Sequence, residues 1–286
     1  MVKQRVKAIV SDYDGTLVPT AHVKNTSTNA IPTELEEILG NIFAEIPVSI
    51  ISTKDFEFLS KKVTFARVLS CIMGIETLVL TTHSSSRIIE KRILHTDLAA
   101  LQTNSKVLEA IAKEVTSHRE FSDLIVEHKH TSEGILAGLT VDWRHHLIDD
   151  WSYYKGAINN LISRMVANLK KPPVPIDVYV QKYSTHPFVD IYGAECNKGM
   201  AFDTVISERT NISVDGKSVL YLGDSENDNP AFRKAGISIG IRSDTRLKPK
   251  LDCSYFLDYE QLTSFLMRLR NNGYLFSEEL LLEAMG

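Results

Sequence analysis

Cysteine and long apolar runs are scarce in this chain, and neither sign of charge dominates it. The three cysteines, Cys71, Cys196 and Cys253, are far apart and form no CxxC pair, so they suggest neither a disulfide framework nor a zinc site. No apolar run approaches the roughly 20 residues of a membrane-spanning helix. The formal net charge of −4 argues against a nucleic-acid partner, because such proteins usually carry a basic footprint. We therefore expect no membrane and no nucleic-acid partner.

What the chain does contain is ample material for a globular core. It has 286 residues, of which 43% are hydrophobic and 24% charged, enough for one large domain or two ordinary ones. The N-terminal segment is basic and then apolar, but its apolar part is too short for a signal peptide and runs directly into Asp12. A cytoplasmic protein is therefore expected.

Apolar runs alternate with amphipathic helical segments, which is typical of an α/β sheet. The pattern predicts strands at 7–11, 48–51, 75–81, 218–222 and 237–240, and helices at 33–44, 55–68, 198–207, 228–235, 259–271 and 277–285. The character changes between about 82 and 190, where we expect strands at 87–94, 123–128, 135–144, 176–182 and 187–192 and helices at 103–117 and 152–169. This part reads as an α+β module inserted into the larger sheet.

The most informative segment is KAIVSDYDGTLVPT, residues 7–20. Its short apolar run predicts a buried strand that carries Asp12 and Asp14 to its C-terminal end. Two close carboxylates cannot both stay charged without a compensating cation, and a hard divalent ion such as Mg²⁺ suits their oxygens. One carboxylate could then act as nucleophile and the other as acid/base. The alternative is a metal-free Asx-type turn, which Asp-Gly favours by itself.

Further polar residues follow predicted strands or begin predicted helices. They are Ser52 and Thr53 after the apolar run 48–51, Lys198 in NKGMAF, and Asp224, Asn227 and Asp228 in GDSENDNPAF. Each has a structural alternative: a helix N-cap for the hydroxyl residues, a solvated surface position for the lysine, and a capped turn for the last group.

Taken in this order, the four segments resemble the motifs of the haloacid dehalogenase-like (HAD) superfamily phosphatases, over residues 7 to about 245. The position of the insertion resembles the type IIB cap of that superfamily. DYDGTLVP and IIS are similar to segments of trehalose-phosphate phosphatases, whereas GDSEND is closer to sucrose-phosphatase and Cof-type relatives. The resemblance implies a Rossmann-like parallel-sheet core, residues 1–82 and 191–286, and a mobile specificity cap, residues 83–190.

The resemblance also implies roles for the motif residues. Asp12 would be the nucleophile that takes the phosphoryl group, Asp14 the acid/base, and Lys198 the positive charge beside both phosphate and nucleophile. Phosphate binding would fall to Ser52 or Thr53, Lys198 and Asn227, and Mg²⁺ binding to Asp12, Asp14, Asp224 and Asp228. Where family members read S-G-R or T-G-R, Ser52 matches the hydroxyl residue, and Thr53 and Lys54 stand in place of Gly and Arg.

In the cap, Glu127, Lys129 and Arg144 resemble the E-x-K and H-Y-R segments of trehalose-phosphate phosphatases, which read sugar hydroxyls and phosphate. The alternative is a set of charged residues on an exposed strand edge. His145 and His146, which follow directly, are expected at a solvated turn.

The resemblance thus implies a Mg²⁺-dependent phosphomonoester hydrolase. Its partner would be a small phosphate ester, such as a sugar phosphate or a similar metabolite, and it would act through an aspartyl phosphate. Two alternatives stay open. One is a phosphosugar mutase of the same superfamily, and the other is a non-catalytic protein that only binds a phosphate ligand.

Overall fold

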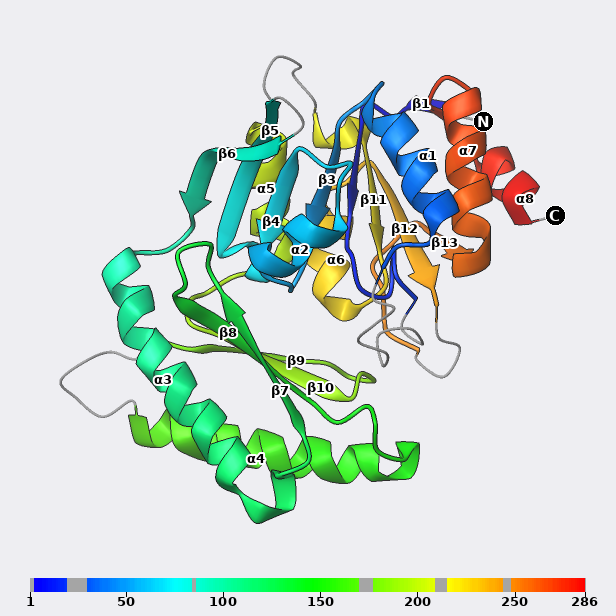
Figure 1. The fold of residues 1–286 in the computed structure, drawn as a ribbon. Coiled ribbons are helices and arrows are strands. Elements are labelled where there is room, and N and C mark those ends of the chain that lie inside the picture. Colours follow the sequence, from blue (N-terminus) through cyan, green and yellow to red (C-terminus); the bar gives the residue numbers. More distant parts are fainter. Residues whose placement is uncertain are drawn as a thin grey trace.

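The computed structural model describes residues 3–19, 30–83, 86–169, 177–208, 215–243 and 248–285. It contains a large sheet, a smaller sheet and a two-stranded pair formed by β1 (Gln4–Arg5) and β14 (Leu275–Phe276). Figure 1 shows the large sheet and its helices above a smaller unit, which presents its own sheet to the large one. This arrangement confirms the α/β fold with an inserted α+β unit that the sequence predicts.

The large sheet has the strand order β13-β12-β11-β2-β3-β4-β5-β6. Its strands are β2 (Ala8–Ser11), β3 (Val48–Ile51), β4 (Val68–Cys71), β5 (Glu76–His83), β6 (Ser86–Leu94), β11 (Val219–Gly223), β12 (Ile237–Arg242) and β13 (Tyr255–Asp258). Pairing is parallel from β13 to β4 and antiparallel from β4 to β6. The central strands β2, β3 and β11 are buried along their whole length, which explains their continuous apolar runs.

Helices cover both faces of the large sheet because alternate side chains of its strands point to opposite faces. Ile9 of β2 packs in one core with α1 (Thr33–Phe43), α7 (Leu262–Asn271) and α8 (Glu278–Met285). Its neighbours Ala8 and Val10 pack in another core with α5 (Lys198–Ser207) and α6 (Asn229–Phe232). The short helix α2 (Phe56–Lys62) follows β3 and is capped by Asp55.

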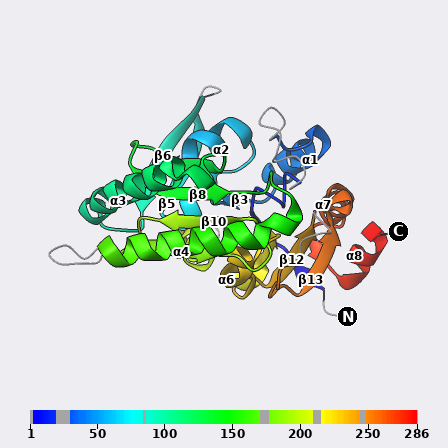
Figure 2. The ribbon, with the colours of Figure 1, turned by 90° about the horizontal axis from the view of Figure 1, so that it is seen from below.

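The smaller unit is an antiparallel sheet with two long helices on one face. Its strand order is β7-β8-β10-β9, from β7 (Ile125–His130), β8 (Leu136–Asp142), β9 (Tyr179–Lys182) and β10 (Phe188–Tyr192). The helices α3 (Leu98–Ser117) and α4 (Trp151–Leu169) lie side by side against it (Figure 2) and enclose a separate core that contains Trp143. The opposite face of this sheet is turned toward the strand ends of the large sheet (Figure 1).

Several strands differ from the sequence-based prediction, among them the pair β1 and β14, which was not predicted. The strand expected in the insertion near 87–94 is β6, which pairs with β5 in the large sheet instead. The strand β4 was not predicted: only its first residue, Val68, falls within the helix expected at 55–68, and the four buried residues are too few to show a strand period. The edge strand β13 was not predicted at all. The chain therefore enters the smaller unit between Leu94 and Leu98 and leaves it after Tyr192.

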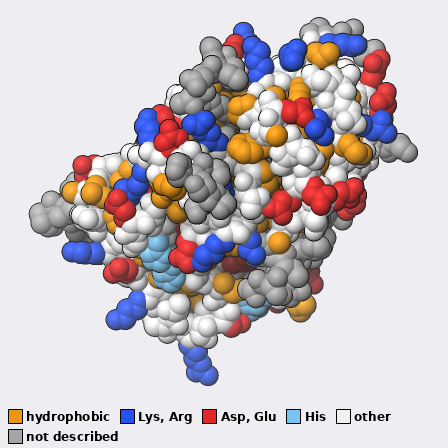
Figure 3. Space-filling view, turned by 45° about the horizontal axis from the view of Figure 1, so that its top comes forward, with side chains coloured by type: hydrophobic (Ala, Val, Ile, Leu, Met, Phe, Trp, Pro, Cys, Tyr) orange, Lys and Arg blue, Asp and Glu red, His pale blue; other side chains and the backbone are white. Residues whose placement is uncertain are grey.

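Side chains of both charge signs are interspersed on the face shown in Figure 3, over both units. Within the part of the chain that the structure describes, no helix is long and apolar enough to cross a membrane.

Candidate active site

The polar motif residues meet at the carboxyl ends of adjacent parallel strands. Asp12 and Asp14 follow β2, and Asp224 follows β11, which pairs with β2 in parallel register. Lys198 is the first residue of α5, whose preceding residue Asn197 caps the helix by accepting from the backbone N–H of Met200. Open α/β sheets bind ligands at this edge.

A buried ion pair joins Asp12 to Lys198. The Lys198 Nζ lies 2.9 Å from Asp12 Oδ1 and 2.8 Å from Asp228 Oδ1, and its side chain is 0% exposed. Burial raises the pKa of Asp12 to about 7, although the Lys198 charge opposes the rise. Burial likewise opposes the charge of Lys198, but Asp12 and Asp228 outweigh it, so the pKa of Lys198 is raised and the lysine stays charged.

Asp224 completes a compact acidic cluster with Asp12 and Asp228, in which one carboxylate oxygen from each lies within 4.8 Å of the others. Burial, followed by the charges of Asp12 and Asp228, raises the pKa of Asp224 well above its ordinary value. The chain at Gly15 passes directly against this cluster. Its φ is +79°, and a Cβ there would lie 1.9 Å from Asp224 Oδ2, so only glycine fits this position.

The acidic cluster fits a divalent cation. Three carboxylates share the single buried charge of Lys198, which leaves an excess of negative charge. In addition, the buried Oδ1 of Asp14 has no hydrogen-bond partner among the described residues. Unpaired carboxylate oxygens of this kind are the ligands that Mg²⁺ prefers. The residues present are therefore suited to the predicted ion.

The carboxylate of Asp228 is occupied by several hydrogen bonds. It accepts hydrogen bonds from Lys198 Nζ, from Tyr221 Oη at 2.6 Å, and from the backbone N–H groups of Asp224 and Ser225 at 3.1 and 3.0 Å. These bonds fix the loop after β11 and orient the lysine. Asp228 thus holds two parts of the site in place.

The two hydroxyl residues after β3 occupy different positions. Ser52 is 0% exposed, and its Oγ accepts from the backbone N–H of Lys54 at 3.1 Å. Thr53 lines the cavity described below. The structure therefore turns Thr53 to the cavity, although Ser52 is the residue that matches the motif of the family.

Asn227 lines the cavity described below, and its side-chain amide is hydrogen-bonded at both ends. Its Oδ1 accepts from Ser225 Oγ at 2.9 Å, and its Nδ2 donates to Tyr183 Oη, also at 2.9 Å. Tyr183 belongs to the smaller unit, so Asn227 joins the two units through a buried hydrogen bond. The Nδ2 group carries a second N–H, which the predicted contact with phosphate could use without loss of the bond to Tyr183.

A cavity of about 430 Å³ lies between the acidic cluster and the smaller sheet. Core residues Asp12, Asp14 and Asp224 line one side, and Glu127, Lys129 and Arg144 line the other. The residues that the sequence assigned to two separate units therefore face one space.

Glu127 is held by Lys54 across the cavity. The Lys54 Nζ lies 2.8 and 2.9 Å from the two carboxylate oxygens of Glu127 and 3.7 Å from Asp14 Oδ2. Burial would raise the pKa of Glu127, but the charges of Lys54, Lys129 and Arg144 outweigh it and lower the pKa to about 2. Glu127 is thus ionised at any physiological pH. The sequence marked Lys54 only as a departure from the family motif and did not indicate this contact.

Lys129 and Arg144 each form an ion pair with an aspartate of the smaller sheet. β7 is an edge strand, yet Lys129 is only 1% exposed, and its Nζ lies 3.4 Å from Asp190 Oδ1. Arg144 Nε donates to Asp142 Oδ2 at 2.6 Å, and the guanidinium stacks over Phe188. For Lys129, the alternative of an exposed strand edge is wrong. Nothing in the sequence pointed to Asp190, because it lies 61 residues from its partner.

Comparison with known proteins agrees with this geometry. Residues 155–253 match a family described as haloacid dehalogenase-like hydrolase. The C-terminal domain of a trehalose-6-phosphate phosphatase from C. albicans is similar in structure, with a TM-score of 0.66 and 17% identity, covering 94% of this chain and 93% of that one. A trehalose-6-phosphate phosphatase related protein has a TM-score of 0.58 and 15% identity, covering 93% and 98%. No curated protein matches the sequence.

A sugar phosphatase of HAD subclass IIB is also similar, with a TM-score of 0.54 and 13% identity, covering 94% of this chain and all of that one, at 100%. The family match and the shared fold confirm the resemblance predicted from the motifs. Residues 155–253 are thus similar in sequence to haloacid dehalogenase-like hydrolases, and the chain has a fold that is also found in a subclass IIB sugar phosphatase.

Proposed function

We propose that the protein is a Mg²⁺-dependent phosphomonoester hydrolase that acts on a sugar phosphate or a similar small phosphorylated metabolite. The observation that carries the proposal is the buried pair of Asp12 and Lys198, placed beside two further carboxylates at the cavity between the two units. Similar structures that are described as phosphatases of sugar phosphates support the choice of substrate class.

Asp12 is the nucleophile in this proposal. Its carboxylate oxygen attacks phosphorus, the bond from phosphorus to the leaving oxygen breaks, and an aspartyl phosphate forms. Lys198 touches the attacking carboxylate and stays charged, so it offsets the negative charge that accumulates there. Water then attacks phosphorus and releases inorganic phosphate.

Asp14 is the acid/base. It lines the cavity two residues from the nucleophile, where it can protonate the leaving alkoxide and then take a proton from the attacking water. Its contact with Lys54, at 3.7 Å, places a second cation near the reacting groups.

Asp12 and Asp224 would hold Mg²⁺, together with Asp14. Asp228 would support them through the hydrogen bonds that fix the loop after β11. When bound, the ion supplies positive charge against the phosphate oxygens and cancels repulsion between phosphate and nucleophile. Thr53 or Ser52 would donate to a phosphate oxygen.

The smaller unit, which we propose as a specificity cap, spans roughly residues 95–192 rather than 83–190, since β6 belongs to the large sheet and β10 ends at Tyr192. Glu127, Lys129 and Arg144 would read the part of the substrate that leaves. The bonds of Tyr183 and Lys54 across the cavity would hold the cap closed during the reaction.

The test is a panel of phosphorylated sugars and glycolytic acids assayed for phosphate release with Mg²⁺ and with a chelator. We expect turnover of at least one sugar phosphate, loss of turnover without metal, and loss in Asp12→Asn. Asp149→Asn, at an exposed position, is the matched control and should keep full activity. If Asp12→Asn keeps a tenth or so of the rate, more than the loss of a nucleophile allows, the assignment of Asp12 is wrong.

Two results together would instead favour the mutase: an aspartyl phosphate that water does not hydrolyse, and activity that requires a sugar bisphosphate.

A further inference from the structure

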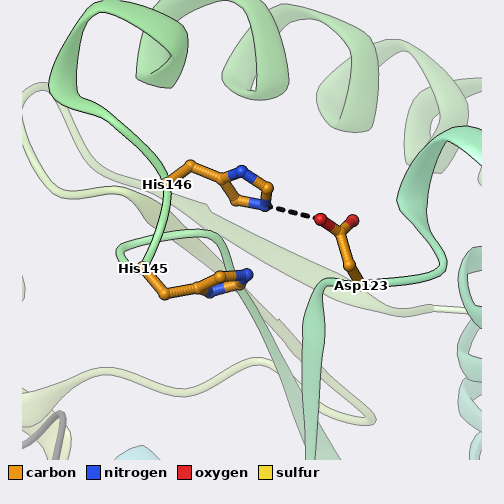
Figure 4. A group of neighbouring side chains, drawn as sticks. All are labelled: Asp123, His145 and His146. Atoms are coloured by element: carbon orange, nitrogen blue, oxygen red, sulfur yellow. Dashed lines mark ion pairs between the residues drawn. The ribbon is translucent and has the colours of Figure 1, made fainter.

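A second group of possible metal ligands lies on the smaller unit, away from the acidic cluster. It consists of Asp123, His145 and His146, and their side chains face one another (Figure 4). One ligand atom from each lies within 4.8 Å of the others, and His146 Nε2 is 3.2 Å from Asp123 Oδ2. The sequence predicts a solvated turn for the two histidines. It contains no sign of the carboxylate that the fold brings to them.

Strand pairing builds this group. In the antiparallel pair of β7 and β8, Ile125 lies opposite Asp142. Asp123 comes two residues before Ile125, and the histidines come shortly after Asp142. The start of β7 and the end of β8 lie next to each other, so Asp123 and the histidines lie at the same end of the sheet. The register that positions Glu127 and Lys129 therefore also fixes the distance between Asp123 and the histidines.

His146 is held in place by its surroundings. Its backbone N–H donates to the carbonyl of Trp143 at 3.1 Å, and its carbonyl accepts from Trp151 Nε1 at 3.1 Å. Its ring packs against Tyr154, with the ring centroids 4.3 Å apart. A ligand with fixed backbone and ring loses little conformational freedom when it binds an ion.

We propose that Asp123, His145 and His146 bind a divalent ion of the Zn²⁺ type, with the remaining coordination positions taken by water. Two imidazole nitrogens and one carboxylate oxygen are a ligand set that Zn²⁺ accepts and Mg²⁺ does not prefer. The acidic cluster of the active site offers oxygen alone. The two sites therefore select different ions, and this proposal does not depend on the proposed function.

A bound ion would act on the rim of the catalytic cavity. His145 lines that cavity and directly follows Arg144, another lining residue. By linking the turn after β8 to Asp123, two residues before β7, the ion would restrict the segment that carries Arg144. Its binding should therefore stabilise the protein against heat.

The test uses the full-length chain without an affinity tag, stripped of metal and kept in excess Mg²⁺ to occupy the acidic cluster. Zn²⁺ is titrated by calorimetry, and Co²⁺ is followed by visible absorption, which reports nitrogen ligands. We expect one Zn²⁺ per chain that Mg²⁺ does not displace. The double variant His145→Gln/His146→Gln should lose it, and Asp123→Asn should bind it at least about tenfold more weakly.

The control is His128→Gln/His130→Gln, which removes two other histidines whose rings stack on β7 but form no such group with a carboxylate among the described residues. It should bind Zn²⁺ like the unaltered chain. Asp123 is 58% exposed, so Asp123→Asn should unfold in chelator at the same temperature as the unaltered chain. Equal Zn²⁺ binding by the unaltered chain and the His145→Gln/His146→Gln variant, or no tight binding by either, would refute the proposal.

Discussion

Replacing the proposed nucleophile should abolish turnover and yet stabilise the metal-free protein. Asp12 is 5% exposed and shares Lys198 with Asp228, so its negative charge is poorly compensated in the fold. Asp12→Asn keeps the size of the side chain and its oxygen toward Lys198 but removes that charge. The lysine keeps its pair with Asp228, so no buried cation is left alone.

The magnitude follows from the pKa. Burial raises the pKa of Asp12 from 3.8 to about 7. At pH values above 7, this shift lowers the free energy of unfolding by about 4 kcal/mol. The folded protein binds this proton more tightly than the unfolded chain. The contribution of Asp12 to stability is therefore greatest at acid pH and is lost as pH rises from about 4 through 7. The difference in the free energy of unfolding between Asp12→Asn and the unaltered protein should therefore grow by about 3 kcal/mol from pH 5 to pH 8.

The assay is thermal unfolding of both proteins in chelator at pH 5 and pH 8. At roughly 2 °C per kcal/mol for a chain of this size, the advantage of Asp12→Asn should grow by roughly 5 °C between the two pH values. Saturating Mg²⁺ should stabilise the unaltered protein more than the variant and so reduce the difference. An advantage that does not change with pH, or a variant that is less stable at pH 8, would refute the view that Asp12 is an uncompensated buried charge.

Three further changes test the other parts of the site. Asp14→Asn should slow hydrolysis of a sugar phosphate far more than that of an activated aryl phosphate, which needs little protonation of its leaving group; equal losses would assign Asp14 to the metal or to local structure. Arg144→Ala should raise KM for the sugar phosphate by a factor equivalent to roughly 1.5–3 kcal/mol of binding free energy, and it should barely change KM for the aryl phosphate. A similar rise in both KM values would place Arg144 at the phosphate itself. Tyr183→Phe should lower the free energy of unfolding in urea by about 1–3 kcal/mol, because its Oη bonds both Asp190 and Asn227; an unchanged value would show that these bonds contribute nothing net.

Several features of the site could be predicted because they are local in sequence. The apolar run 8–10 predicts a buried strand, and Asp12, Asp14 and Gly15 follow it directly. Parallel strands end at one edge of a sheet, so residues placed after β2 and β11 had to approach one another. The helix that begins at Lys198 is likewise indicated by its own N-cap, Asn197.

The assignment of strands to sheets was less predictable. β6 has the composition of a strand in either unit, and only its pairing with β5 places it in the large sheet. β4 is four residues long, and β13 has a mixed pattern of buried and exposed residues. Strand pairing is a contact between distant segments, and hydrophobic periodicity does not specify the partner.

The sequence alone determined the motifs of the candidate site, their order along the chain and the kind of sheet that holds them, because those features depend on neighbouring residues. Only the tertiary structure decided which side chains meet across the two units. Lys54 meets Glu127 and Tyr183 meets Asn227, over separations of 73 and 44 residues. Within the smaller unit, strand pairing likewise brings Asp123 to His146, 23 residues away. A carboxylate or a lysine has the same intrinsic chemistry wherever it occurs. Its partner, its burial and hence its charge state follow from the packing of the two sheets against each other.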